Sequence, residues 1–445
     1  MSSTTKEREE QVAYPYRRIM YKMQLILLTG ERLMACGAST DRIRRDMVRA
    51  ATYMDITPDK INIHINYTTL MLNIHDDSHS YTEFCKCREH GVNMTMLEEI
   101  NELTWFAIKD NYPLEKYEAI LRSIGNMPSP YPPFLSTLCA GLACGGICKL
   151  FGCDWISFFC TAISAALGFS VRRLCNAYGF NVYAGIAISA FTATAAACFT
   201  QSISGTSTPS YPMIAAALFL IPGIPLINAV DDMLNDFIMA GTTRFTHTVL
   251  IIGSMTFGIS IALWMGNVTD FTRVPIQPDD IYFSQPLAAA FAGVGYATIF
   301  NVPRRLLPVI ALGAVVAVDV RNIMVIEFDS NLVAGSFLGA SILGVVFQRF
   351  IHFFHTPGTV MTIPSVIPLM PGVLLYRLLF SILNITTIDA QTLLLGIRSG
   401  VEAATVVIAM AVGVTIPTIF FRPRLEEARR QRMERLLPQR YDEKP

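Results

Sequence analysis

From Pro132 to Phe421 the sequence is a series of apolar stretches, several of them near the ~20 residues that an α-helix needs to cross a bilayer. A helix bonds its own backbone polar groups, so long apolar stretches of this kind fold as membrane-spanning helices. The whole chain is 52% hydrophobic and 16% charged, whereas soluble domains carry about 25% charged residues. These features predict a mainly α-helical, polytopic membrane protein surrounded by the lipid bilayer.

The apolar part predicts ten spans. They lie at about 133–151, 155–174, 182–200, 211–230, 245–266, 283–301, 305–320, 332–351, 360–383 and 397–421. Cytoplasmic loops are rich in Lys and Arg. With the N-terminus inside, the arginines near the span ends fall on the inner side: Arg172, Arg173, Arg244, Arg304, Arg305 and Arg349. The loops at 201–210 and 269–280 then lie outside, and both termini are cytoplasmic.

Composition divides the chain into five parts. They are a cytoplasmic α+β domain (1–128), a first five-helix membrane half (129–267), a linker (268–280), a second five-helix half (281–421) and a basic cytoplasmic tail (422–445). The first residues lack the apolar core and cleavage site of a secretory signal. We therefore expect residues 1–128 to remain in the cytoplasm.

The first part predicts a small α+β domain. Residues 17–36 form an amphipathic helix ended by Gly37, and Ser39 or Thr40 can cap a second helix that runs to about Met54. The stretch "INIHINY" (61–67) alternates apolar and polar residues, as a half-buried strand does. "TLMLNIH" and "YTEFC" extend it to a meander, and two helices follow at about 93–110 and 114–125.

This domain also holds a cluster of residue types that can bind metals: His75, Asp76, Asp77, His79, Cys85, Cys87 and His90. Their spacing matches none of the usual zinc patterns, because no second CxxC or HxxxH completes a tetrahedral set. We expect no metal site and no cofactor here. The residues also lack a nucleophile with a base at a recognisable spacing, so they do not predict an enzyme. The formal net charge is zero, which gives no reason to expect nucleic acid as a partner.

The spans fall into two similar sets of five. "NVYAGIAISA" (181–190) is similar to "NLVAGSFLGA" (331–340). In each set a later Pro-Gly pair follows at nearly the same interval, 38 residues from Gly185 to Gly223 (223 − 185) and 37 from Gly335 to Gly372 (372 − 335). An odd number of spans per repeat inverts the second copy in the membrane, which is typical of secondary transporters.

The Pro-Gly pairs lie in "FLIPGIPLIN" (219–228) and "LMPGVLL" (369–375), inside apolar runs. Proline removes a backbone donor and breaks the helix, which frees polar groups where lipid cannot bond them. Paired breaks at matching positions indicate a substrate site near the midplane, where helix-end N–H groups and free carbonyls meet a polar solute. Paired structural kinks are the alternative.

Polar side chains follow both breaks. Asn228, Asp231 and Asp232 follow the first, and Tyr376 and Arg377 follow the second. Arginine can bind a carboxylate through two hydrogen bonds, so Arg377 is the expected substrate anchor.

Further charged groups lie in other spans. Arg398 is the second choice of anchor, and it shares a helix face with Glu402. Asp231, Asp232, Asp319 and Glu402 are candidates to carry a coupling proton, and for each charge an interface position or a structural ion pair is the alternative.

Small residues recur at helix-packing intervals in three GxxxG pairs: Gly141 with Gly145, Gly335 with Gly339, and Gly396 with Gly400. Such pairs let two helices approach closely. We interpret them as packing sites within the chain, and they also permit a homo-oligomer without requiring one.

At this point "IPGIPLINAVDDM" (221–233), after a domain that contains "EHGVNM" (89–94), resembles the N-terminal portion of the threonine/serine exporter (ThrE) family. "FNVPRR" (300–305) and "IPLMPG" (367–372) resemble its C-terminal portion, which in some members is a separate small membrane protein. The chain therefore resembles a fused form of a two-component, YjjP/YjjB-like exporter. The resemblance covers roughly residues 17–421.

The resemblance implies a ten-span exporter of the inner (plasma) membrane, with a cytoplasmic N-terminal domain, driven by the proton-motive force. The family string points to Pro222, Gly223, Pro225, Asn228 and Asp232, and in the second half to Pro368, Pro371 and Gly372. It implies a small-molecule substrate, either threonine and serine or a succinate-type dicarboxylate. The alternatives are a channel-like pore, or a membrane-anchored sensor or enzyme with the N-terminal domain as its active part.

Overall fold

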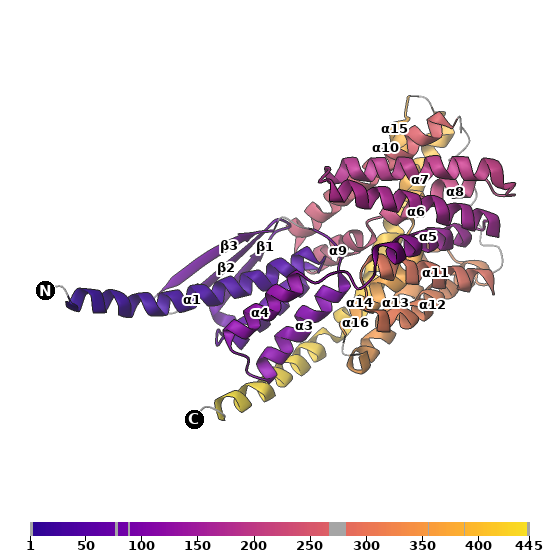
Figure 1. Ribbon diagram of the computed structural model, residues 1–445. Helices are drawn as coiled ribbons and strands as arrows, with labels where there is room; N and C mark the ends of the chain where they lie inside the picture. Colours follow the sequence, from indigo (N-terminus) through magenta and orange to yellow (C-terminus); the bar gives the residue numbers. More distant parts are fainter. Residues whose placement is uncertain are drawn as a thin grey trace. The chain divides into compact units, whose positions relative to one another are not determined.

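The computed structural model describes residues 3–75, 79–87, 90–266, 282–354, 356–386 and 388–442, which are mostly helical (Figure 1). The chain forms two compact units. The N-terminal unit comprises Met1–Pro128, Asp232–Thr243 and Pro423–Pro445, and the membrane unit comprises Ser129–Asp231 and Arg244–Arg422. Three helices therefore contribute residues to both units.

Four helices and a small sheet make up the first part of the N-terminal unit. They are α1 (Ser3–Ala35), α2 (Thr40–Tyr53), the 3₁₀ turn η1 (Pro58–Lys60), β1 (Ile61–Ile65), β2 (Thr69–His75), β3 (Ser80–Lys86), α3 (Met94–Lys109) and α4 (Leu114–Gly125). The predicted meander is confirmed, since the strands pair antiparallel in the order β1-β2-β3 beside α1 (Figure 1). Alternation places Ile61, Ile65, Leu70 and Leu72 in the core of this unit.

The turn between α1 and α2 follows the prediction at one end and departs from it at the other. Gly37 ends α1 in the left-handed region, at φ 84°. Ser39 stands at the N-cap of α2, but its side chain makes no capping hydrogen bond. Instead, the backbone N–H and the hydroxyl of Thr40 donate to the carboxylate of Asp232, at 2.7 and 2.8 Å. A residue 192 positions away therefore caps α2.

The remaining elements run from Pro133 to the end of the chain. They are α5 (Pro133–Leu150), α6 (Trp155–Ala177), α7 (Val182–Ser204), α8 (Ser210–Ala215), η2 (Leu218–Leu220), α9 (Gly223–Leu234), α10 (Ile238–Met265), α11 (Ser284–Ile299), η3 (Arg304–Leu306), α12 (Leu307–Ile326), α13 (Leu332–Phe354), α14 (Gly358–Val366), η4 (Ile367–Leu369), α15 (Gly372–Leu383) and α16 (Ala390–Asp442). The basic residues after 421 continue α16 as a helix.

Within the described residues, seven helices are long and apolar enough to cross a membrane, and the number rises to nine if each of two bent helix pairs is one span. The predicted span at 283–301 corresponds to α11, whose 16 residues are shorter than the ~20 that a bilayer requires. Neither the number ten nor the five-plus-five division follows from helix length alone. The predicted outer loop at 269–280 lies outside the described residues.

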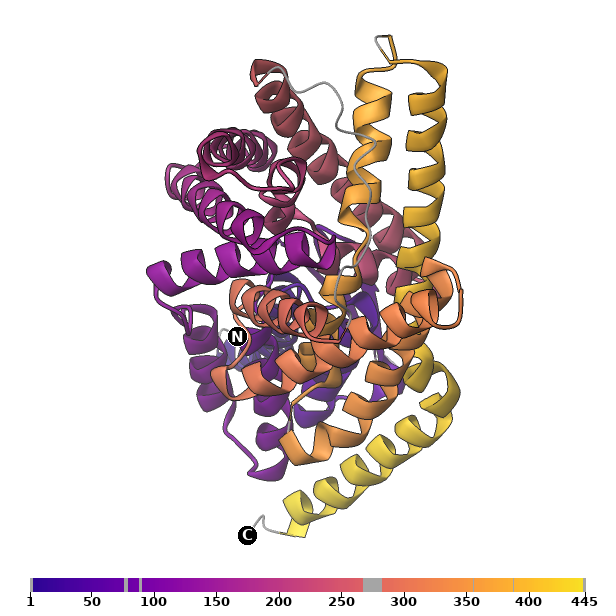
Figure 2. The same ribbon diagram turned by 90° about the vertical axis from the view of Figure 1, so that its right-hand side faces the viewer.

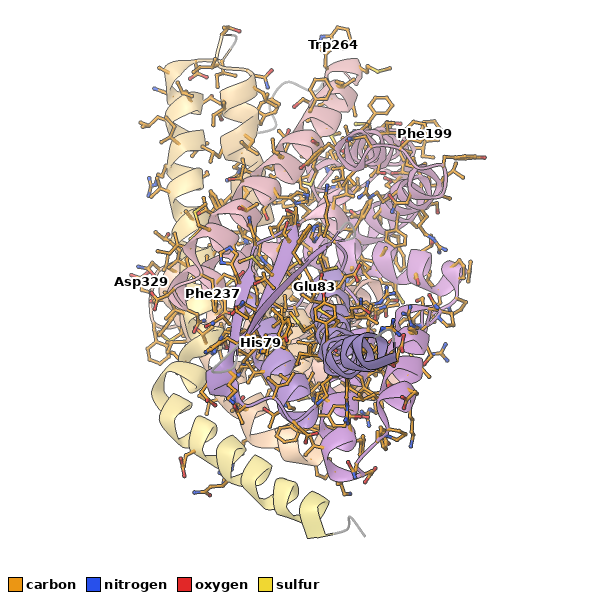
Figure 3. The ribbon with its side chains drawn as sticks, turned by 90° about the vertical axis from the view of Figure 1, so that its left-hand side faces the viewer. His79, Glu83, Phe199, Phe237, Trp264 and Asp329 are labelled. Atoms are coloured by element: carbon orange, nitrogen blue, oxygen red, sulfur yellow. The ribbon has the colours of Figure 1, made fainter. Side chains whose placement is uncertain are left out.

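The outward faces of these helices are apolar, as lipid requires. The large exposed side chains include Phe159 and Ile163 on α6, Phe199 on α7 and Trp264 on α10. Figure 3 shows Phe199 and Trp264 pointing away from the helices that carry them. Because so many large apolar groups are exposed in the membrane unit, this surface is suited to hydrocarbon and unsuited to water.

Hydrogen bonds join polar loops to one another in the membrane unit. The carboxylate of Asp154 accepts hydrogen bonds from the backbone of Ser157 and from Thr206 and Ser207, which joins the α5–α6 loop to the α7–α8 loop. Burial alone would raise the pKa of the Asp154 carboxyl. The hydrogen bonds have the larger combined effect and lower it, so the pKa lies well below its usual range. In the later part of the unit, Arg305 donates to Thr356, which joins the α11–α12 loop to the α13–α14 loop.

The predicted GxxxG pairs all lie at helix–helix contacts. A Cβ atom built on Gly141 would lie 2.5 Å from the carbonyl oxygen of Ala162 on α6, and one on Gly339 would lie 2.6 Å from that of Ala317 on α12. Gly396 packs against Ser381, which joins α16 to α15. Figure 2 shows α15 and the first part of α16 side by side. The glycines therefore act as packing sites within this chain.

A further close approach joins α5 to α11 in antiparallel orientation. A Cβ atom on Gly146 would lie 2.8 Å from the backbone nitrogen of Ala292, and a Cβ atom on Gly295 would lie 2.7 Å from that of Ala143. The two contacts are equivalent if each residue of α5 is matched with the residue 149 positions later in α11. Gly146 then matches Gly295 (295 − 146 = 149), and Ala143 matches Ala292 (292 − 143 = 149). Each helix thus presents the same kind of surface to the other.

We predict that Gly146→Ala and Gly295→Ala each destabilise the protein by about 1–3 kcal/mol, because the added methyl group meets backbone that can move only if the helices separate. Thermal unfolding in detergent measures the effect. Gly253→Ala on α10 is the matched control, since a Cβ atom there would have nothing within 4 Å. Equal melting temperatures for all three variants would contradict the prediction.

Candidate functional site

The two predicted helix breaks are present and have the same local geometry. The helices on either side meet at 59° around Pro222 and at 58° around Pro371. Steric contact with a proline ring pushes the preceding residue into an extended conformation. Ile221 accordingly has φ −61° and ψ 121°, and Met370 has φ −60° and ψ 130°. Each break therefore follows from its proline, and α9 and α15 each begin at the next glycine.

The backbone groups freed at the breaks are partly bonded within the turn. The N–H of Gly223 donates to the carbonyl of Ile221, and that of Gly372 donates to the carbonyl of Met370, each at 2.9 Å. Further along, Leu226 donates to the carbonyl of Pro222 at 3.0 Å. Fewer helix-end groups are therefore left for a substrate than the sequence alone suggested.

The breaks also contact one another. A Cβ atom on Gly223 would lie 3.5 Å from the Cε atom of Met370, and one on Gly372 would meet the side chain of Ile221. The same interval of 149 residues matches the partners of these two contacts. Gly223 matches Gly372 (372 − 223 = 149), and Ile221 matches Met370 (370 − 221 = 149). All four residues are buried. A methyl group on either glycine would meet the end of an isoleucine side chain, that of Ile367 at Gly223 and that of Ile221 at Gly372, so these side chains would have to shift.

Pro225 and Pro368 lie on the two sides of these turns. Pro225 is in the first turn of α9, where its missing N–H removes no intrahelical hydrogen bond, and it is half-buried. Pro368 is buried in η4, just before the second break. Both prolines shape the turns, and neither offers a polar group from its side chain.

The second break leads directly to a buried tyrosine and a half-buried arginine. Tyr376, one turn after Gly372, is 1% exposed, and its hydroxyl faces that of Ser260 on α10. Arg377 is half-buried and interacts electrostatically with Glu402 on α16. The site thus combines a guanidinium, a carboxylate and two hydroxyls from three helices. Ser260 was not identified from the sequence, because an isolated serine in an apolar span carries no distinctive signal.

Arg398, the second predicted anchor, has a different environment. It is exposed on α16, and no hydrogen bond or ion pair joins it to Glu402 within the described part of the chain. Their spacing places both residues on one side of the helix, and the charge of Glu402 also acts on Arg377 of α15. Sequence spacing does not reveal that α15 packs against α16.

The first break leads to three polar residues with separate surroundings. Asn228 is buried at 4% exposure, and Asp231 is half-buried, both in the membrane unit. Asp232 belongs to the N-terminal unit, where it is fully buried and bonded to Thr40. Of the predicted proton carriers, Asp232 therefore has a strong structural partner already.

Asp319 is the remaining predicted proton carrier and lies on α12. It is half-buried, and its Oδ1 atom is buried without a hydrogen-bond partner among the described residues. An unbonded carboxylate oxygen in such a position is costly, and protonation removes much of that cost.

A buried polar chain was missed by the sequence analysis. Gln285 on α11 donates to the carbonyl of Lys149 on α5 and accepts from Asn322 on α12, which in turn accepts from Arg321. Lys149 is 3% exposed and donates to the carbonyl of Cys153. Its signal in the sequence is a lysine and two amides close to span ends, which a search restricted to charges within spans overlooks.

No group of three or more metal-binding side chains occurs in the ranges that the structure describes. The sequence analysis considered a metal site only for the cluster of His, Asp and Cys residues at 75–90. Asp76 and Asp77 of that cluster lie outside the described residues.

Comparison with known proteins identifies two adjacent matches. Residues 24–265 match the family described as "Putative threonine/serine exporter", and residues 285–420 match "Threonine/Serine exporter, ThrE". No solved structure matches the chain.

Similar proteins come from several bacteria. "Probable succinate transporter subunit YjjP" of Escherichia coli is 27% identical over 207 residues, which are 46% of this chain and 80% of that protein. "Probable threonine/serine exporter" of Mycobacterium tuberculosis is 19% identical over 416 residues, 90% of this chain and 76% of that protein. "Threonine/serine exporter" of Corynebacterium glutamicum is 20% identical over 378 residues, 83% of this chain and 77% of that protein.

We predict that Gly372→Ala destabilises the protein by about 1–3 kcal/mol through its collision with the Cδ1 atom of Ile221. Ile221→Val removes that atom and restores most of the loss. Ile367→Val is the matched control, because Ile367 contacts Gly223 instead and its change leaves the Gly372→Ala defect in place. A double-mutant cycle from thermal unfolding tests this, and equal rescue by both valine variants would refute the contact.

Proposed function

Because the chain belongs to the threonine/serine exporter family, we propose that it is a secondary active exporter of a small carboxylate-bearing metabolite across the inner (plasma) membrane. The observation that carries this proposal is the pair of matching helix breaks, in contact with one another and followed by Arg377 and Glu402. Members of this family are transporters, so an enzymatic role for residues 1–128 is set aside. A multi-pass membrane protein also agrees with the number of long apolar helices.

We further propose that the membrane part is a five-plus-five inverted repeat of ten helices, with α11 as the sixth span. Every element of the first half has a counterpart in the second, from α5 and α11 to α10 and α16. Two contacts support a two-fold relation between the halves: the contact of α5 with α11, and the contact between the two breaks. In each of them, the residues on the two sides match at an interval of 149 positions. Antiparallel packing of equivalent helices is what an axis in the membrane plane requires.

The same repeat gives the proposed orientation. Five spans per half place equivalent loops on opposite sides of the membrane. With both termini in the cytoplasm, the α6–α7 loop lies inside and the α12–α13 loop outside. The arginines near the span ends then follow the positive-inside rule.

The charged pair at the second break favours a zwitterionic substrate. A guanidinium such as that of Arg377 binds a carboxylate, and Glu402 beside it can accept an ammonium group. The position equivalent to Arg377 in the first half is Asn228 (377 − 149), so the repeat does not supply a second cation there. Threonine or serine therefore suits this site better than a dicarboxylate.

Succinate or a similar dicarboxylate is the second candidate. The relative named a succinate transporter subunit is 27% identical to the first part of this chain. For that substrate Arg377 would hold one carboxylate, and Arg398 would have to turn inward from its exposed position to hold the other.

We propose that export is coupled to protons through carboxylates of the membrane unit. Asp319 is the leading carrier because one of its oxygens is buried without a hydrogen-bond partner in the described residues. Glu402 and Asp231 are the other candidates. A simple channel is less consistent with this arrangement, because the two breaks contact one another through apolar side chains.

We predict that Arg377→Ala lowers export by at least about tenfold, because it removes a charged hydrogen-bonding group from the site. Cells that overproduce the chain are loaded with labelled threonine or labelled succinate, and efflux is measured. Arg349→Ala is the control, since Arg349 is an exposed arginine on α13. If Arg377→Ala exports like the parent, or if neither solute leaves the parent cells faster than cells without the protein, the proposal fails.

We predict that the equivalent positions Tyr178 and Phe328 (328 − 178 = 150) face opposite sides of the membrane. Both side chains are exposed, at 74% and 70%. In a variant without its native cysteines, an impermeant maleimide applied to intact cells labels Phe328→Cys and leaves Tyr178→Cys unlabelled until the cells are opened. Labelling of both from outside, or of neither, would exclude the inverted repeat.

A further inference from the structure

The carboxylate of Asp232 lies in an unusual place for a residue of α9. It stands in the last turn of that helix, which ends at Leu234. A negative charge near a helix C-terminus is unfavourable for the helix itself, because unbonded carbonyls already give that end a partial negative charge. The charge of Asp232 therefore does not stabilise α9.

The compensation comes from α2. Both carboxylate oxygens of Asp232 accept from Thr40, one from the backbone N–H at 2.7 Å and one from the hydroxyl at 2.8 Å. Thr40 is the first residue of α2, where free N–H groups and the helix dipole favour a negative charge. Asp232 and Thr40 are both fully buried, so water does not screen this contact.

The helix that Asp232 caps is firmly held within the N-terminal unit. Ile43 and Met47 of α2 are fully buried. Arg49 forms a buried ion pair with Asp46 at 2.9 Å and lies over the ring of Trp105. A helix packed in this way can hold the end of α9 through Asp232, whereas an exposed loop could not.

The second half of the chain has no such carboxylate. On the proposed repeat, the position equivalent to Asp232 is Ser381 (232 + 149), a small neutral residue that packs against Gly396. On the proposed repeat, the contact with Thr40 is therefore specific to α9, and α15 has no equivalent of it.

From these observations we propose that Thr40 and Asp232 form a positioning pair, through which α2 of the N-terminal unit fixes α9 and thereby controls movement at the Pro222–Gly223 break. Asp232 lies nine residues after Gly223 (232 − 223) on one continuous helix. A rigid helix transmits a restraint at one end to the other. The proposal rests on the proposed transport function, and it assigns to the N-terminal unit the task of holding a moving transport helix.

The transport experiment uses the full chain in proteoliposomes with labelled threonine and labelled succinate. Thr40→Val keeps the side-chain shape but removes the hydroxyl, and it is expected to lower the maximal rate by about tenfold while KM changes by less than about twofold. Thr40→Ser retains the hydroxyl and is expected to restore the parent rate. Thr52→Val is the matched control, because the hydroxyl of Thr52 bonds only within α2 at 2.9 Å.

A double variant tests whether the two residues act together. Asp232→Ala with Thr40→Val is expected to transport no more slowly than Asp232→Ala alone, since both changes break one contact. Asp236→Asn controls for loss of a nearby exposed charge. Additive losses would overturn the proposal. It would also fail if Asp232→Asn removed the proton dependence of transport while Thr40→Val had no effect, because Asp232 would then be a proton carrier.

Hydrogen exchange gives a measurement that does not depend on transport. In the purified parent, the amide of Thr40 and the α9 amides from Leu226 onward are expected to be protected. Thr40→Val is expected to increase exchange along α9, while gel filtration and thermal unfolding show that the protein remains folded. Unchanged exchange in α9 would overturn the positioning role. If the parent transports neither solute while exchange in α9 still increases, the proposed function fails and the contact stands.

Discussion

The close approach of α5 to α11 is the contact on which the arrangement of the membrane unit depends. Lipid tails are as apolar as the side chains that face them, so burial of apolar area does little to bring helices together in a bilayer. Contact between surfaces that fit closely must supply the attraction. Gly146 and Gly295 allow backbone to meet backbone, and the adjoining helices α6 and α12 then pack on this pair through further small residues. The two breaks meet within the same framework.

Much of the fold could be predicted because its determinants are local. Alternating residues in "INIHINY" gave the first strand, Gly37 marked the end of α1, and the Pro-Gly pairs at 222–223 and 371–372 marked the two breaks. The prediction was incomplete where partners are distant in sequence. No local pattern shows that Asp232 caps α2, since 192 residues separate it from Thr40.

The candidate site shows the same division between local and distant determinants. Arg377 was expected because an arginine after a helix break is rare and costly in a membrane. The electrostatic interaction of Arg377 with Glu402 was not expected, since spacing along α16 favoured Arg398 as the residue that acts on Glu402. The chain from Lys149 through Gln285 to Asn322 was missed because each residue alone resembles an ordinary polar group near a span end.

On the proposed inverted repeat, the interval of 149 residues between exchanged contacts bears on how such a protein can diversify. In a dimer of identical halves, every substitution would occur twice, on both sides of the membrane at once. Two halves that differ in sequence carry each substitution once, so one face of the bilayer can acquire a residue that the other lacks. Asp232 opposite Ser381, and Arg377 opposite Asn228, are differences of this kind. On that proposal, directionality can reside in a handful of side chains.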